Sequence, residues 1–89
     1  MSWEVYIIQA KSGKLYTGIT KDLERRFSEH SKKNGQGARF FRISEPQSIV
    51  FRESHLNRSE ATKREIAIKK MNRSEKEELI ENYLDKEDI

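Results

Sequence analysis

The 89-residue sequence predicts a single α+β domain in which helices flank a three-stranded, largely antiparallel sheet. Runs rich in β-branched and aromatic residues alternate with segments of helical period, in the order β-β-α-(short α)-β-α-α. A chain of this length has room for one core only. We therefore expect one domain over residues 1–84, followed by an acidic tail over residues 85–89.

The first two strands, VYIIQA and KLYTGI, form a predicted hairpin around the loop KSG. In a three-residue loop the third position, here Gly13, takes the left-handed conformation that glycine adopts without a Cβ penalty. This loop pairs Ile8 with Tyr16 and Tyr6 with Gly18, so both tyrosines share one face. A two-residue turn would place them on opposite faces, and we favour the three-residue loop. The other face is the predicted core face, formed by Val5, Ile7, Leu15 and Ile19.

A helix is predicted next, over about residues 21–32, with Thr20 or Asp22 as its cap. At about 100° per residue, Arg26 and His30 fall on the same side as the apolar residues of this helix. Those apolar residues are Leu23 and Phe27. The stripe therefore carries a guanidinium and an imidazole beside the core.

The middle of the chain is predicted to contain a flexible NGQG break, a short helix or an irregular segment at 38–42, and a third strand at 47–52. His55 is expected to lie in a loop, without an assignable role. The tetrapeptide NRSE then occurs twice, at 57–60 and 72–75. In each copy an asparagine precedes a glutamate by three positions, as in a capping box. We therefore expect two further helices, over about 58–70 and 73–84.

Charge is distributed unevenly around a net value of +3. Residues 75–89 hold two basic and seven acidic residues, whereas residues 1–74 hold 16 basic and eight acidic residues. A basic body suits a polyanionic ligand, although charge alone is equally typical of a solvated surface. The candidate nucleic-acid-binding residues are Lys11, Lys14, Arg25, Lys32, Lys33, Arg39 and Arg42.

Several protein classes are excluded by composition. The sequence has no cysteine, so it offers neither a disulfide framework nor a thiolate zinc site. The apolar run at 3–10 is too short for a secretory signal and lacks a basic region before it. No segment approaches the roughly 20 apolar residues needed to cross a bilayer. We expect a soluble, cytoplasmic protein without membrane contact.

Five residues are candidates for chemistry, and each also has an ordinary structural explanation. Tyr6 and Tyr16 are typical half-buried packing residues. Arg26 beside an apolar stripe either extends to solvent or binds phosphate, and a lone His30 is usually a partly buried structural histidine. Glu65, on the margin of an apolar helix face, either forms a salt bridge or binds a hard cation such as Mg²⁺.

Together, these residues resemble the motif of the GIY-YIG nuclease superfamily. VYI at 5–7 and YTG at 16–18 correspond to its two sequence blocks, followed by Arg26, His30 and a helical Glu65. The stretches LYTGITKDLERRFSEH and ATKREIAIKK are similar to the bacterial stand-alone, single-domain members. The resemblance extends over nearly the whole chain, from Trp3 to about Ile80.

The resemblance implies an endonuclease that uses a divalent metal to hydrolyse DNA phosphodiester bonds in repair or recombination, with RNA left open as a substrate. Tyr6 and Tyr16 would lie at the scissile phosphate, with Tyr6 the preferred base for the attacking water. Arg26 would bind the phosphate, and His30 would shape the site or assist proton transfer. Glu65 would hold one cation, Mg²⁺ or Mn²⁺.

The sequence departs from the family pattern at Glu4, which stands where the first block has a glycine. This carboxylate is expected to lie on the tyrosine face and to add negative charge near approaching DNA. A chain without a separate recognition domain is also expected to have weak activity alone or to need a protein partner. The alternatives are a nucleic-acid-binding module without cleavage and an adaptor with a vestigial site. We expect a monomer.

Overall fold

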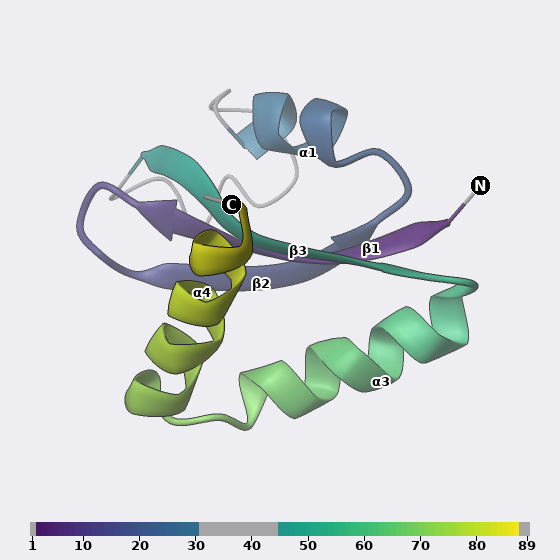
Figure 1. Ribbon diagram of the computed structural model, residues 1–89. Helices are drawn as coiled ribbons and strands as arrows, with labels where there is room; N and C mark the ends of the chain where they lie inside the picture. Colours follow the sequence, from purple (N-terminus) through teal and green to yellow (C-terminus); the bar gives the residue numbers. More distant parts are fainter. Residues whose placement is uncertain (1, 31–44, 88–89) are drawn as a thin grey trace.

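The computed structural model describes residues 2–30 and 45–87 (Figure 1). Its elements are β1 (Trp3–Ala10), β2 (Leu15–Thr20), α1 (Leu23–His30), β3 (Pro46–His55), α3 (Arg58–Lys69) and α4 (Arg73–Glu87). The three strands form one antiparallel sheet in the order β2-β1-β3. This architecture confirms the predicted fold class. The short helix or irregular segment expected at 38–42 lies outside the described residues.

The hairpin between β1 and β2 has the predicted register. Ile8 pairs with Tyr16, and Tyr6 pairs with Gly18. Gly13 has a φ of 92°, in the left-handed region, and its amide donates a hydrogen bond to the Ala10 carbonyl at 2.9 Å. The three-residue loop therefore forms as expected, and both tyrosines lie on one face of the sheet.

Both faces of the sheet are covered by helices. Helix α1 lies over one face, and α3 and α4 lie over the other (Figure 1). The face of α3 and α4 holds the predicted core, and its fully buried or nearly buried residues are Val5, Ile7, Val50, Phe51, Ala61 and Ile68. The tyrosine face is buried as well, by Leu23 and Phe27 of α1 against Tyr6, Ile8 and Ala10. The two cores arise because the apolar stripe of α1 needs a partner surface of its own.

Strand β3 is longer than predicted and contains a bulge. Ile7 pairs with Phe51 and Ile8 pairs with Ile49, so Val50 is an extra residue in the ladder. The bulge lets the neighbours Val50 and Phe51 both join the core under α3 and α4. The expectation that His55 lies in a loop was wrong, because this residue pairs with Trp3 at the end of β3.

The two NRSE repeats begin helices, as their sequence predicts. The Asn57 side chain accepts a hydrogen bond from the Glu60 amide at 2.9 Å, and Asn72 accepts one from the Glu75 amide at 2.8 Å. At the second repeat the Glu75 carboxylate also accepts from the Asn72 amide at 3.0 Å, which completes a capping box. Helix α4 continues to Glu87, three residues past the predicted end.

Helix α1 is capped by Asp22 rather than by Thr20. The Asp22 carboxylate accepts a hydrogen bond from the Arg25 amide at 3.2 Å, while the Thr20 hydroxyl accepts from the Asp22 amide at 3.1 Å. Thr20 therefore supports the cap without forming it. None of the helices in residues 2–30 and 45–87 is both long and apolar enough to span a bilayer.

Candidate active site

Tyr6 lies at the centre of the candidate site, on the middle strand of the sheet. Its side chain is buried, with 2% of its surface exposed. The ring crosses Gly18, its partner on the edge strand β2, so closely that a Cβ at Gly18 would lie 2.6 Å from the Tyr6 Oη. Only a glycine at this position leaves room for the ring in this orientation.

Tyr16 lies beside Tyr6 on the same face. The two ring centroids are 6.2 Å apart and the rings are tilted by 37°. A side-chain hydrogen bond joins the two residues, and Tyr16 is half-buried whereas Tyr6 is buried. The pair therefore presents one inner and one outer phenol at the edge of the sheet.

Arg26 and Glu65, on two different helices, have opposite effects on the ionisation of the Tyr6 hydroxyl. Arg26 is half-buried on α1, and Glu65 lies on α3 with 19% of its side chain exposed. Both side chains act electrostatically on Tyr6.

The surroundings of Tyr6 raise the pKa of its hydroxyl well above the usual value of about 10. Burial is the main cause, because it disfavours the phenolate. Tyr16 raises the pKa further, by its charge and by its hydrogen bond, and the Glu65 carboxylate adds to this. Arg26 opposes the rise. Tyr6 is therefore a neutral phenol at neutral pH.

Glu65 is the candidate metal ligand, and one carboxylate is compatible with the small number of protein ligands that Mg²⁺ uses. Within the described part of the chain, no group of three or more histidine and acidic side chains is placed to hold a metal. Mg²⁺ commonly uses one or two carboxylates, with phosphate oxygens and water completing its shell. Lys69 lies 3.4 Å from the Glu65 carboxylate, so this carboxylate is already paired with a cation.

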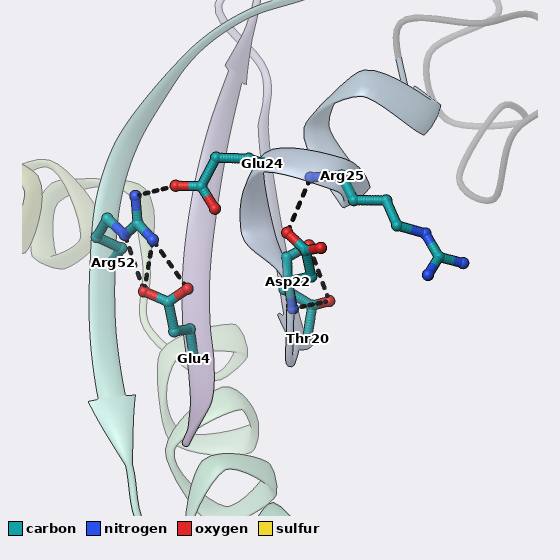
Figure 2. A network of polar contacts seen from close by, with 6 residues as sticks. All are labelled: Glu4, Thr20, Asp22, Glu24, Arg25 and Arg52. Atoms are coloured by element: carbon teal, nitrogen blue, oxygen red, sulfur yellow. Dashed lines mark hydrogen bonds and ion pairs between the residues drawn. The ribbon is translucent and has the colours of Figure 1, made fainter. Parts of the chain in front are cut away.

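Glu4 does not carry the unpaired negative charge that the sequence predicts (Figure 2). Its carboxylate accepts two hydrogen bonds from the Arg52 guanidinium, from Nε at 2.8 Å and from Nη2 at 2.9 Å. Arg52 also donates to Glu24 of α1 at 3.0 Å. Burial alone would lower the pKa of Arg52, but the hydrogen bonds to Glu4 and Glu24 raise it overall. The glycine-to-glutamate departure is therefore compensated by an arginine on β3.

Arg52 is the residue that sequence reasoning missed. It pairs with Tyr6 across β1 and β3 and lies on the same face as Glu4. The sequence signal for this network is weak, since it consists only of an arginine at the end of a strand-like run. Its partner becomes evident only when the pairing of β1 with β3 is known.

Three of the seven predicted basic residues, Lys11, Lys14 and Arg25, belong to the described part of the chain. Lys11 and Lys14 are exposed at the hairpin loop, where Lys11 pairs with Glu45 at 2.9 Å. Arg25 is exposed in the first turn of α1, which follows the end of β2 that is remote from the hairpin loop. Figure 2 shows its side chain extending away from Asp22. The remaining expected positions, Lys32, Lys33, Arg39 and Arg42, lie outside the described residues, as does the side chain of His30 at the end of α1.

Comparisons with known proteins point to one family. The family model of the GIY-YIG catalytic domain matches residues 2–78. A UPF0213 protein of Desulfotalea psychrophila is 46% identical over 79 residues, which cover 89% of this chain and 71% of the relative. A UPF0213 protein of Staphylococcus saprophyticus is 45% identical over 76 residues, covering 85% and 90%.

A solved structure supports the same relationship. The solution NMR structure of a UPF0213 protein from Bacillus halodurans superposes with a TM-score of 0.58 at 34% identity. The match covers 91% of this chain and 84% of that one. The similarity therefore extends over the sheet and its helices and is not confined to short motifs.

Proposed function

The chain belongs to the GIY-YIG family and groups with the bacterial UPF0213 proteins, and we propose that it is a divalent-metal-dependent endonuclease of DNA. The observation that supports this most is that Tyr16 lies beside Tyr6 and that Tyr16, Arg26 and Glu65 all influence the ionisation of the Tyr6 hydroxyl. Four elements contribute these side chains. A phenol, a guanidinium and a carboxylate are the groups needed to orient water, bind a phosphate and hold a hard cation.

In the proposed reaction Tyr6 orients the attacking water. Because Tyr6 is a neutral phenol at neutral pH, it acts as a base only when added positive charge near its hydroxyl lowers its pKa. Tyr16, hydrogen-bonded to Tyr6, provides a path for the proton toward the surface. Burial thus keeps Tyr6 protonated, and therefore unable to act as a base, while no further positive charge is bound near its hydroxyl.

Arg26 is proposed to bind a non-bridging oxygen of the scissile phosphate and to stabilise the charge that grows there. Its half-buried position favours this role, because a guanidinium partly removed from water interacts more strongly with an anion. Glu65 would hold a Mg²⁺ or Mn²⁺ ion, and such an ion would polarise the phosphate and favour ionisation of nearby groups. Lys69 would have to give up its contact with Glu65 when the ion binds.

The proposal is tested by cleavage of labelled DNA, as single strand, duplex, flap and four-way junction, with Mg²⁺ or Mn²⁺. We expect metal-dependent products from the wild type. Arg26→Ala and Glu65→Ala should each reduce the rate by about 10²- to 10³-fold, as loss of one transition-state contact does. Tyr6→Phe should also abolish most of the activity while keeping the ring in place.

Glu60→Ala is the matched control, because it removes an exposed carboxylate from the same helix and should leave cleavage unchanged. Circular dichroism of each variant checks that the fold is retained. A wild-type protein that binds these DNAs but cuts none of them, with either metal, would overturn the proposal in favour of a non-catalytic binding module. The DNA structure that is cut fastest would indicate whether the protein acts in repair or in recombination. A low rate on every substrate would indicate that it depends on a protein partner.

A further inference from the structure

A pocket of about 220 Å³ opens next to the candidate active site. Its lining residues are Trp3, Thr20, Lys21, Asp22, Arg25 and Arg26. Arg26 therefore belongs both to this pocket and to the surroundings of Tyr6. Its lining residues come from the start of β1, the end of β2, the connection from β2 to α1 and the first turn of α1. Figure 1 shows where these elements lie.

Trp3 contacts two cations: Lys21, which lines the pocket, and Arg58, which lies beside the indole but is not part of the lining. The Lys21 Nζ lies 5.3 Å from the indole centroid, and the Arg58 Cζ, from the first turn of α3, lies 5.6 Å from it. Cation–π contacts at this distance orient the side chains without neutralising their charge. The indole thus keeps both positive charges available to an anion.

The cations in and beside this pocket differ from most others in the described ranges. Arg52, Arg64, Lys69 and Arg73 each contact a carboxylate. Lys21, Arg25 and Arg58 have no such contact among residues 2–30 and 45–87. The one acidic residue of the lining, Asp22, uses a carboxylate oxygen to cap α1, and the Arg25 guanidinium points away from it (Figure 2).

We propose that this pocket binds the DNA phosphodiester adjacent to the one that is cleaved, through Lys21 and Arg25 of its lining and through Arg58, which Trp3 holds beside it. The inference rests on the proposed nuclease function, because it takes Arg26 as the ligand of the scissile phosphate. The volume is below the roughly 300–1,000 Å³ of pockets that enclose a drug-sized ligand. A pocket of this volume can hold a segment of the DNA backbone that passes through it. Positive side chains held against an indole are expected to bind the charged phosphate, whereas base edges are read by hydrogen bonds.

Trp3 makes the pocket directly observable, because it is the sole tryptophan in the sequence. We would titrate the protein with a short oligothymidylate in EDTA, so that no cleavage occurs, and follow both Trp3 fluorescence and the anisotropy of labelled DNA. The expected result is a fluorescence change that saturates with the anisotropy. Inorganic phosphate and a dinucleotide, used as separate competitors, distinguish a free-anion site from a site for a nucleic-acid strand.

The variants are Lys21→Ala and Arg58→Ala, with Lys86→Ala as the control for loss of one exposed positive charge on α4. The slope of log K against log salt is negative, and for a single strand each lost phosphate contact lowers its magnitude by about 0.7. Lys21→Ala and Arg58→Ala should each lower the magnitude by about that amount. Lys86→Ala should leave it unchanged, and Lys21→Arg should restore it.

Failure of this inference is distinguishable from failure of the proposed function. Unchanged slopes in both variants, or no binding of the oligonucleotide by the wild type, would overturn the pocket assignment even if the protein cuts DNA. Equal competition by inorganic phosphate and by the dinucleotide would also overturn it. If both variants lower the magnitude of the slope but the protein cuts no DNA, phosphate binding at the pocket would be supported. The nuclease function, and with it the place of this phosphate next to a cleaved one, would be overturned.

Discussion

At the scale of single residues, the missing side chain at Gly18 determines where the Tyr6 hydroxyl lies. The ring of Tyr6 passes over Gly18 on its way from the middle strand to the edge of the sheet. A methyl group there would lie 2.6 Å from Oη and 2.8 Å from Cζ of Tyr6, both part of a rigid phenol. The tyrosine and the glycine therefore act as one structural unit, although the chain separates them by a hairpin.

Gly18→Ala should displace Tyr6 and abolish most of the cleavage activity. We expect overpacking of this kind to cost about 1–3 kcal/mol of unfolding free energy. Cleavage assays together with urea denaturation measure both effects. The control is Gly13→Ala, which is strained by its φ of 92° but has nothing within 4 Å of an added Cβ.

The control should lose stability by about 1–2 kcal/mol, the cost of a left-handed backbone for an L-residue, and keep its activity. If both variants lost activity in proportion to stability, the contact of Gly18 with Tyr6 would have no specific role. Loss of activity in Gly18→Ala alone would show that the position of the phenol matters.

At the scale of elements, α1 is the helix that most needs external support. It has eight described residues, and a helix this short is marginal in water by itself. Leu23 and Phe27 hold it on the sheet, Asp22 caps it, and Arg52 ties Glu24 to Glu4 (Figure 2). Because α1 also carries Arg26, these contacts position the proposed phosphate ligand.

Arg52→Ala should destabilise the protein by about 1–3 kcal/mol, because it leaves the mostly buried Glu4 carboxylate, 15% exposed, without its two hydrogen bonds. Glu24→Ala should have little effect, since its side chain is 72% exposed and such pairs contribute about 0–1 kcal/mol. Urea denaturation measures both changes.

A double-mutant cycle with Glu4→Ala tests whether the pair is the cause. The double variant should cost less than the sum of the two single variants, because neither charge is then left alone. Strict additivity would mean that Arg52 stabilises the protein through its packing and not through Glu4.

At the scale of the whole molecule, the high pKa of Tyr6 links its protonation to global stability. Burial, more than any single neighbour, disfavours its phenolate in the folded state. Above about pH 10 the unfolded chain releases this proton while the folded chain retains it. By linkage, the free energy of unfolding must then fall as pH rises, and this contribution is fully present below that pH.

Tyr6→Phe should therefore lose less stability than the wild type between about pH 8 and about pH 10.5. Urea denaturation of both proteins at the two pH values measures the difference. Equal losses would contradict the prediction, because they would mean that Tyr6 has the same proton affinity in the folded and unfolded states. The comparison needs no metal or DNA and so tests the burial of the phenol by itself.

The sequence alone was sufficient for features that depend on neighbours along the chain. The Gly13 loop sets the register that places Tyr6 and Tyr16 on one face, and each NRSE repeat begins a helix. The helical period placed Leu23, Arg26 and Phe27 on one side of α1. These features follow from backbone geometry and short-range hydrogen bonds, which hardly change with the rest of the fold.

Tertiary structure decided the features that join distant parts of the chain. The pairing of β1 with β3 gives Glu4 its partner Arg52 and extends β3 to His55, and neither result follows from residues 47–52. Likewise, Trp3 contacts Lys21 and Arg58 only because β1 begins, β2 ends and α3 begins close to one another. The physical reason is that backbone geometry and short-range hydrogen bonds constrain only residues a few positions apart. The contacts of Arg52 and Trp3 depend instead on strand pairing and on how the helices pack on the two faces of the sheet.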